Sequence, residues 1–407
     1  MITNQLQKKP KLRFPEFGDE WAHKKLGKVA EFLKGKGISK NEVTVDGKYP
    51  CIKYGELYTQ YNEIVKKIVS KTNVLPEDSF VGQKNDVIIP SSGETALDIA
   101  TTSCVKNAGI LFGGDINVIR FSKDQSGDFF AYYLTNFQRR NIAKLAQGQS
   151  VVHLYASQLK KLEVGVPSFP EQQKIASFLE FVDEWLNDLR EEKEFLQKYK
   201  KGMMQNIFSQ EIRFKDESGK SFPKWEDKKL NDIVYGKDKR TKVNNEFPIL
   251  SSSMTGVYLQ TDYFNKQTAS QNNVGYKIIE KGDFVYRSMS DTGYFTFNLQ
   301  NKVDVGIVSP AYPVFKNKEG IVPSFLFYAL NNFDYIKRQI LFIKEGGTRY
   351  AMSFPKFIKI KIKLPSFNEQ QKIADFFVSL DKSIEVKQQQ ITLVDEWRKG
   401  LMQGLFI

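Results

Sequence analysis

Two stretches of the chain carry apolar residues at alternating steps of three and four. The first begins at Glu171 and ends at Phe208, and the second fills the C-terminal end of the sequence. Their apolar positions are Ile175, Leu179, Val182, Leu186, Leu189, Leu196, Met203 and Ile207 in the first stretch, and Ile373, Phe377, Leu380, Ile384, Ile391, Val394, Leu401 and Leu405 in the second. Charged residues interrupt the pattern at Lys193, Lys200, Lys387 and Arg398. This heptad spacing predicts two long helices, each with one apolar seam.

Each predicted helix is too long to be covered by one small domain. A helix of about 38 residues extends roughly 57 Å at 1.5 Å per residue. Because an apolar seam of this length needs a cover, we expect the two helices to pack antiparallel against each other. Each stretch also follows a proline and carries Glu in its first turn, which is typical of a helix start.

The segments before each helix, about 14–165 and 215–363, have a different pattern. Short runs of Phe, Tyr, Val and Ile alternate with Gly, Asn, Asp and Ser, which predicts short twisted strands with a few small helices. The stretch from Phe357 to Leu364 alternates apolar and basic residues, so we expect a half-buried strand with a cationic outer face. Leu159 to Val166 is its less basic counterpart.

The chain contains an internal repeat. The segment Pro167 to Ala176, PSFPEQQKIA, returns as PSFNEQQKIA from Pro365, an offset of 198 residues (365 minus 167). At the same offset KGMMQ at 201–205 returns as KGLMQ at 399–403, and Gly148-Gln149-Ser150 has its counterpart at 346–348. Upstream, LRF at 12–14 and Trp21 reappear as IRF at 212–214 and Trp225. The repeat unit is thus a variable domain followed by a fixed helix.

These patterns predict an α+β protein with internal pseudo-two-fold symmetry. We expect a first domain over residues 1–165, a long helix over 166–214, a second domain over 215–363 and a second long helix over 364–407. The two domains share a frame while their loops differ, as expected if the loops recognise different things. Neutral drift after duplication would leave the same pattern.

Composition points to an anionic partner and a reducing compartment. Lys and Arg outnumber Asp and Glu by 60 to 47, which gives a formal charge of +13 and a pI near 9.3. Such a balance favours nucleic acid as partner. Two cysteines and a polar N-terminal segment indicate a cytoplasmic protein, and no apolar run approaches the roughly 18 residues of a membrane helix.

Catalytic motifs are missing from the sequence. His23 and His153 lack metal-site spacing, and neither a Gly-rich phosphate loop nor the Pro-Pro tetrapeptide of adenine methyltransferases occurs. The run Glu191-Glu192-Lys193 has nuclease-like spacing but lies on a predicted helix, where charge runs usually face solvent. We therefore expect no catalytic residue, metal or cofactor. A stand-alone repeat-built DNA-modifying enzyme (a nuclease or methyltransferase) and a protein-only scaffold are the two alternatives. Activity assays and the salt dependence of DNA affinity distinguish them.

The order of variable domain, EQQKIA helix, second variable domain and second EQQKIA helix resembles the specificity subunits of Type I restriction-modification enzymes over nearly the full length. The resemblance implies a non-catalytic subunit whose two target-recognition domains each read one half of a split double-stranded DNA site. It implies that the helices set the spacer and dock two methyltransferase subunits, which bring the methyl donor. Restriction subunits then join through the complex and bring ATP-driven translocation and cleavage.

Candidate DNA-binding residues are the polar and basic side chains near glycine-rich turns. They are Lys34, Lys36, Lys53, Tyr54, Ser91, Ser92, Gln149 and Ser150 in the first domain, and Lys237, Lys239, Arg240, Ser251, Ser252, Ser253, Arg287, Ser288, Thr348, Arg349 and Tyr350 in the second. Arg287 and Arg349 are the best candidates for bidentate contact with guanine, whereas lysines more often meet phosphates. An ordinary exposed loop residue is the alternative for each.

Overall fold

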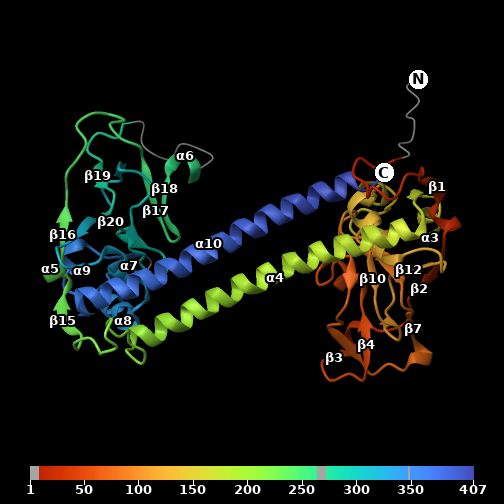
Figure 1. The fold of residues 1–407 in the computed structure, drawn as a ribbon, viewed down its shortest axis with the longest axis horizontal. Coiled ribbons are helices and arrows are strands. Elements are labelled where there is room, and N and C mark those ends of the chain that lie inside the picture. The colour runs from red at the N-terminus through yellow and green to blue at the C-terminus, as the bar shows by residue number, and fades with distance from the viewer. Residues whose placement is uncertain (1–8, 264–271, 347–348) are drawn as a thin grey trace. The chain divides into compact units, whose positions relative to one another are not determined.

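The computed structural model describes residues 9–263, 272–346 and 349–407. The chain divides into two compact units, Met1–Arg190 with Gln389–Ile407, and Glu191–Gln388. Each unit holds one domain of short strands and small helices, together with part of each of two long helices, α4 (Phe169–Phe208) and α10 (Phe367–Gly404) (Figure 1). The predicted α+β fold with two domains and two long helices is therefore confirmed.

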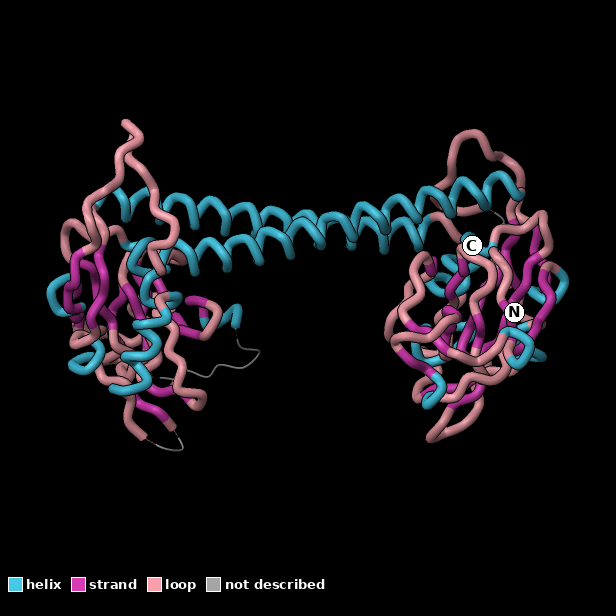
Figure 2. The backbone as a smooth tube through the Cα atoms, turned by 90° about the horizontal axis from the view of Figure 1, so that it is seen from below, coloured by secondary structure: helices cyan, strands magenta, loops and turns pink. Residues whose placement is uncertain are grey.

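Within each unit the two long helices run side by side (Figure 2), and the residue colours of Figure 1 show that they are antiparallel. In the first unit Asp183 of α4 pairs with Arg398 of α10, and Arg190 lies 4.0 Å from Asp395. In the second unit Lys200 pairs with Asp381 and Glu192 with Lys387. Along these pairs the residue numbers of α10 decrease as those of α4 increase, as expected for antiparallel helices. Seam residues buried in this pairing include Ile175, Leu179, Val182, Leu186, Ile373, Phe377, Val394 and Leu401.

The first domain is built on two five-stranded sheets. One has the order β2 (Ala30–Lys34), β12 (Ile116–Phe121), β8 (Asp86–Pro90), β10 (Ser103–Val105) and β5 (Ile64–Val65); the other has the order β3 (Val43–Thr44), β6 (Ser70–Thr72), β4 (Tyr49–Ile52), β11 (Leu111–Phe112) and β7 (Phe80–Val81). Two small ladders pair β1 (Ala22–Lys25) with β14 (Glu163–Val166) and β9 (Ser92–Gly93) with β13 (Val152–His153). The helices are α1 (Gly127–Tyr132), α2 (Arg139–Ala143) and α3 (Ala156–Leu159), with single turns η1 (Leu26–Lys28), η2 (Lys40–Glu42), η3 (Tyr54–Tyr58), η4 (Pro76–Asp78) and η5 (Tyr133–Phe137). Buried aromatic residues of α1 pack against the seam of α4 and the end of α10.

The second domain keeps the same plan with fewer paired strands. A four-stranded sheet has the order β16 (Val234–Lys237), β24 (Val314–Asn317), β20 (Phe284–Val285) and β22 (Asn298–Leu299). Paired strands are β15 (Glu226–Lys229) with β26 (Lys361–Leu364), β17 (Leu250–Ser253) with β18 (Gly256–Leu259), β19 (Lys277–Glu280) with β23 (Val305–Val308), and β21 (Met289–Ser290) with β25 (Tyr350–Ala351). The helices are α5 (Leu230–Ile233), α6 (Gln260–Tyr263), α7 (Pro323–Asn332), α8 (Asp334–Ile343) and α9 (Phe354–Phe357).

The predicted strand over 357–364 is half wrong. Only Lys361–Leu364 is extended, with Lys361 and Lys363 exposed on its outer face and Ile362 buried. Phe357 instead ends the short helix α9, which begins after Ser353 and carries a proline in its first turn. A proline favours a helix start, and the fully buried Phe357 fills the core of the domain. The counterpart over 159–166 differs from the prediction in the same way, because Leu159 ends α3 and only Glu163–Val166 is a strand.

The repeated motif residues join each domain to its helix. The Arg13 guanidinium bonds both oxygens of Glu171 at 2.8 Å, and the Trp21 indole donates to the same carboxylate. Arg213 and Trp225 likewise hold Glu369 in the second unit, at 2.7 to 3.0 Å. The next residue, Gln172 or Gln370, accepts from a domain backbone N–H and donates to the carbonyl of the proline five residues earlier, Pro167 or Pro365. The LRF, Trp and EQQ motifs thus form one buried joint.

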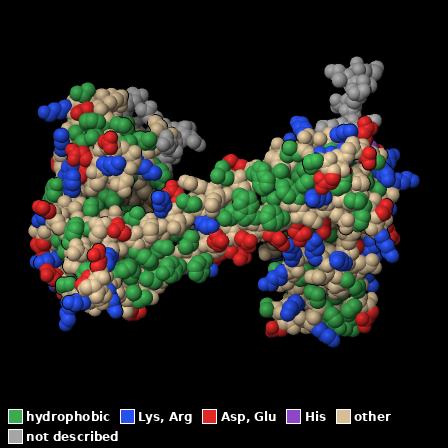
Figure 3. Space-filling view, in the orientation of Figure 1, with side chains coloured by type: hydrophobic (Ala, Val, Ile, Leu, Met, Phe, Trp, Pro, Cys, Tyr) green, Lys and Arg blue, Asp and Glu red, His purple; other side chains and the backbone are tan. Residues whose placement is uncertain are grey.

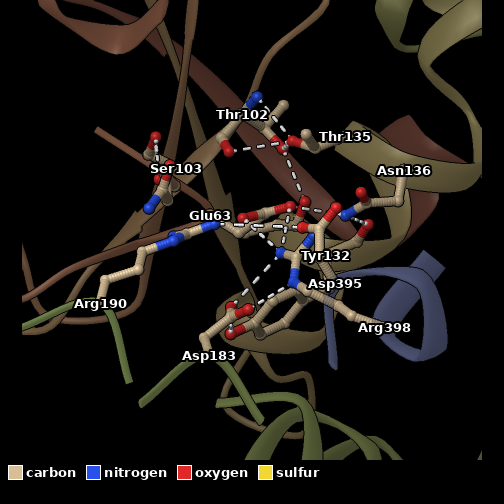
Figure 4. A network of polar contacts seen from close by, with 12 residues as sticks. Glu63, Thr102, Ser103, Tyr132, Thr135, Asn136, Asp183, Arg190, Asp395 and Arg398 are labelled. Atoms are coloured by element: carbon tan, nitrogen blue, oxygen red, sulfur yellow. Dashed lines mark hydrogen bonds and ion pairs between the residues drawn. The ribbon is translucent and has the colours of Figure 1, made fainter. Parts of the chain in front are cut away.

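A second polar cluster lies where each domain meets both helices. In the first unit Tyr132 donates to Asp183 at 2.7 Å, and Arg398 pairs with Asp183 and with Glu63 (Figure 4). In the second unit Tyr328 donates to Asp381 at 2.6 Å, and Lys200 pairs with Asp381. Burial raises the pKa of both tyrosines well above the ordinary value, so each hydroxyl stays a donor. The seam interruptions at Arg398 and Lys200 are therefore the cations of two equivalent clusters.

Candidate nucleic-acid interface

A hairpin recurs in both domains at equivalent positions. Gln147 and His153 exchange backbone hydrogen bonds of 2.9 and 2.7 Å, and Glu345 and Ala351 exchange bonds of 3.0 and 2.8 Å. The hairpins begin at Gly148 and Gly346, whose φ angles are +122° and +98°. A Cβ at either glycine would lie 2.1 Å from a backbone carbonyl across the turn, so only glycine fits. The sequence correspondence between these two turns is therefore also a structural one.

In the first domain this hairpin presents Gln149 and Ser150, both exposed. Leu154, just after the hairpin, donates its N–H to the carbonyl of Ser91 at 2.9 Å. The structure therefore brings Gln149 and Ser150 into one region with Ser91 and Ser92, although more than fifty residues separate the pairs in sequence. Ser91 is half-buried and Ser92 buried, so the exposed polar groups are mainly those of the hairpin.

In the second domain the matching region is more basic. Met352 donates its N–H to the carbonyl of Ser288 at 2.8 Å, as Leu154 does to Ser91. A pocket beside it is lined by Ser253, Arg287, Ser288 and Arg349, and we call it the reading pocket. Arg349 is 62% exposed and lies 3.0 Å from Asp291, an exposed pair that a ligand can displace. Tyr350 is half-buried in β25, and Thr348 lies outside the described residues.

A second candidate group of the first domain lines a separate groove. Lys53 and the exposed Tyr54 lie there with Glu94 and Asp115, and Lys53 is 3.6 Å from Glu56. The N–H of Ser91 donates to the carbonyl of Asp115, so this groove adjoins the hairpin region. Lys34 at the end of β2 and Lys36 in the following loop are exposed but do not line the groove.

Several candidates of the second domain serve the protein itself. Lys237 is 17% exposed and lies 2.6 Å from Asp283 and 2.8 Å from Glu280. Burial alone would lower the pKa of Lys237, but its hydrogen bonds to these carboxylates raise it, so the charge is used internally. Ser252 is buried and accepts from Asn298 at 2.8 Å. Ser251 is half-buried, whereas Lys239 and Arg240 are exposed, Arg240 beside Asp238.

Within the described ranges of the chain no group of three His, Cys, Asp or Glu side chains is arranged to hold a metal ion. Among the described helices, none is long and apolar enough to span a membrane. Cys51 and Cys104 are both free and buried, and burial raises the pKa of the Cys51 thiol to about 11.

Sequence reasoning missed two patches of exposed and half-buried aromatic residues along the long helices, and the segment that enters each domain adds one phenylalanine to each patch. The first aromatic patch comprises Phe14, Phe178, Trp185 and Trp397, and the second comprises Phe195, Tyr199, Phe214 and Phe376. Phe178 and Trp397 correspond to Phe376 and Tyr199 at the repeat offset. Hydrophobic side chains gather on the helical surface of each unit (Figure 3). The sequence did contain a signal for these patches, because their aromatic residues on the long helices each lie one residue before a position of the heptad seam.

A model of the Type I restriction modification DNA specificity domain matches this chain twice, over residues 18–195 and 223–396. The Type I restriction enzyme MjaVIII specificity subunit of Methanocaldococcus jannaschii is 25% identical, over 97% of this chain and 93% of the relative. The HindI specificity subunit of Haemophilus influenzae is 25% identical over 45% of this chain and 41% of the relative. The crystal structure of the Type-I restriction-modification S subunit from M. genitalium superposes with a TM-score of 0.61 at 18% identity, covering 98% of this chain and 99% of that chain.

Proposed function

The chain belongs to the family of Type I restriction-modification DNA specificity subunits, and from this premise we propose that its two hairpin regions are the surfaces that read the two halves of a split DNA site. One observation carries the proposal. The two hairpins share their backbone hydrogen bonds and their glycine, but among the described residues the first presents Gln149 and Ser150 whereas the second presents Arg349. A fixed scaffold with unlike contact residues is what two readers of different half-sites require.

The proposed contact residues divide into those that suit a particular base and those that suit phosphates. Gln149 in the first domain has the amide that pairs bidentately with adenine. Arg287 and Arg349 in the second domain have the guanidinium that pairs bidentately with guanine. Lys34, Lys36, Lys239 and Arg240 are exposed cations that suit phosphates. Lys237 and Ser252 drop out of the proposed contact set because their polar atoms are engaged inside the domain.

Exchange of residues 215–363 for the matching domain of a relative tests this assignment. We expect one half of the methylated DNA motif to change and the other half to remain, because each domain reads its half independently. The motif is measured by sequencing modified bases in DNA from cells that carry the chimera and its partner subunits. A reciprocal exchange of the first domain is the matched control and should change the opposite half. A change of both halves by either exchange contradicts the two-reader assignment.

The two aromatic patches are the proposed docking sites for two methyltransferase subunits. They occupy equivalent places in the repeat, and exposed Trp, Tyr and Phe are the residues enriched at protein interfaces. One patch in each unit would account for two methyltransferase subunits per specificity subunit. Restriction subunits then join through the methyltransferases. Trp185 is 43% and Trp397 46% exposed, so both can be removed without opening the core.

A double variant Trp185→Ala, Trp397→Ala should lose one methyltransferase subunit and keep the other. The reason is that the second aromatic patch remains intact and forms its own interface. The mass of the purified complex, measured by light scattering, reports the stoichiometry. Tyr155→Ala, which removes a 51% exposed aromatic residue of the first domain outside the patch, is the control and should leave the mass unchanged. A full complex from the double variant would exclude this docking site.

We propose that the partner subunits carry out methyl transfer and cleavage. Because these subunits act on cellular DNA, the proposal also places the chain in the cytoplasm. The acidic run with nuclease-like spacing supports this division of labour. Glu192 pairs with Lys387 of α10, and Lys193 bonds Gln388, so these groups hold the two helices together. Assays of the purified chain alone should then show neither nuclease nor methyltransferase activity. Either activity in the isolated chain would favour the enzyme alternative.

A further inference from the structure

The second unit contains a cleft between its domain and helix α4 that the reading surfaces leave unused. Its walls come from α4, the β17–β18 turn, the 293–302 segment, α7 and α8. Four lysines line it, namely Lys200 and Lys201 of α4, Lys337 of α8 and Lys302 of a loop. Of the lining residues in the described part of the chain, none is Asp or Glu. We call it the lysine cleft.

The first unit holds the equivalent cleft, which provides an internal comparison. That cleft is lined by four acids, Glu63, Asp98, Asp183 and Asp395, against three arginines, Arg139, Arg190 and Arg398. Several of these groups pair with one another, as Arg398 does with Asp183 and Glu63 (Figure 4). The same place in the repeat is therefore nearly neutral in the first unit and cationic in the second.

The difference comes from individual substitutions on the helices. Lys399 of α10 lies 2.7 Å from Asp395, one turn earlier. Its counterpart Lys201 of α4 has Gln197 at that position, so the carboxylate that would neutralise it is replaced by an amide. Lys201 and Lys302 are exposed, and Lys337 lies 3.7 Å from Asp334, an exposed pair worth little in water. Only Lys200 is held closely, by Asp381.

The lysine cleft shares a wall with the reading pocket. Met254, Tyr294, Phe295 and Thr296 line both, so the β17–β18 turn and the 294–296 segment form a ridge between them. Tyr294 is 65% and Met254 67% exposed on this ridge. An anionic chain that occupies the reading pocket, beside Arg287 and Arg349, reaches the lysine cleft by crossing the ridge.

We infer that the lysine cleft binds the phosphates of the DNA strand that leaves the reading pocket of the second domain. The inference rests on the proposed function, since it extends the DNA contact that the reading pocket begins. Continuity with that pocket favours DNA over an acidic segment of a partner protein. Because the equivalent cleft of the first unit carries paired acids, the extra phosphate contacts belong to the second half-site alone.

The test uses the full chain assembled with its methyltransferase subunits and a duplex that contains the methylated motif. A triple variant, Lys201→Gln, Lys302→Gln, Lys337→Gln, removes three cations from the cleft. Each phosphate contact contributes about 0.9 to the slope of log affinity against log salt, so the slope should fall by about 2 to 3. Hydroxyl-radical protection should shrink on the flank of the second half-site and remain on the first. Discrimination between matched and mismatched motifs should be unchanged, since phosphate contacts do not read bases.

A charge-matched control replaces Lys198, Lys281 and Lys359, three exposed lysines outside the cleft, with Gln. It should retain the slope and the footprint. If the unsubstituted complex binds specifically and the triple variant keeps its slope, the inference is wrong while the proposed function stands. If the triple variant instead loses its methyltransferase subunits, the cleft serves a protein partner and the inference is again wrong. Absence of specific binding by the unsubstituted complex would contradict the proposed function itself.

Discussion

At the scale of single residues, exposure separates the candidate DNA contacts into two sets. Arg349, Gln149 and Ser150 project from turns that a positive-φ glycine makes sharp. Lys237 and Ser252 face inward and satisfy Asp283 and Asn298. The sequence places all of these side chains near glycine or polar runs. It does not reveal that Asp283, 46 residues from Lys237, is the buried acid that needs a cation. Long-range pairing of this kind is invisible to local pattern.

The variant Arg349→Ala should relax specificity at one base position of the second half-site. A lost bidentate contact with guanine costs about 1 to 3 kcal/mol of discrimination, whereas a lost phosphate contact weakens all sequences equally. Competition binding against every single-base change in the motif distinguishes the two results. Arg338→Ala, an exposed arginine of α8 outside the reading pocket, is the control and should leave the ranking of sequences intact. A uniform loss for Arg349→Ala would make this residue a phosphate contact.

At the scale of elements, periodicity predicted the long helices and failed on the short ones. Heptad spacing over about 38 residues has one structural solution, so α4 and α10 follow from the sequence. The four residues from Phe357 to Ile360 are too few to distinguish a strand from a helical turn, and burial of Phe357 decided for the turn. The charged interruptions of the seam could be read as defects, but Arg398 and Lys200 complete the polar clusters with Tyr132 and Tyr328.

The variant Arg398→Met should destabilise the first unit more than Lys200→Met destabilises the second. Arg398 faces both Asp183 and Glu63, and Glu63 is nearly buried, so its removal leaves two carboxylates without their cation. Breaking a buried pair costs about 3 to 5 kcal/mol. Lys200 pairs with one carboxylate, that of Asp381, whose side chain is 43% exposed, so loss of this ion pair should cost about 1 kcal/mol or less. Denaturant unfolding of both variants measures the difference.

A rescue variant separates charge from packing in this comparison. Adding Glu63→Gln and Asp183→Asn to Arg398→Met removes both carboxylate charges while keeping similar volume. Much of the lost unfolding free energy should return, because the cost lies in the uncompensated charges. If the triple variant is as unstable as Arg398→Met alone, packing by the arginine stem rather than its charge holds this joint.

At the scale of the whole molecule, the repeat has a consequence for chain connectivity. In the second unit the N–H of Ile212 donates to the carbonyl of Asn206 at 3.0 Å, where the chain passes from α4 into the second domain. In the first unit the N–H of Leu12 donates to the carbonyl of Gly404 at 2.9 Å. Leu12 corresponds to Ile212, and Gly404 corresponds to Asn206. The same contact is therefore made with a covalent connection in one unit and without it in the other.

A circular permutant should consequently retain function. It joins Ile407 to Lys11 by a short flexible linker and opens the chain at Gln210, a residue of the α4-to-domain connection with φ of +66°. The Ile407 carbonyl accepts from Tyr133 at 2.7 Å, so the new junction starts from a fixed point beside the first domain. Ends that already meet are the usual condition for a tolerated permutation. Sequencing of methylated DNA should show the motif of the unpermuted chain.

A permutant opened instead at Asn187, within α4, is the control and should fail because it cuts the helix seam. A folded Gln210 permutant that no longer directs methylation to this motif would show that the two connections are not equivalent.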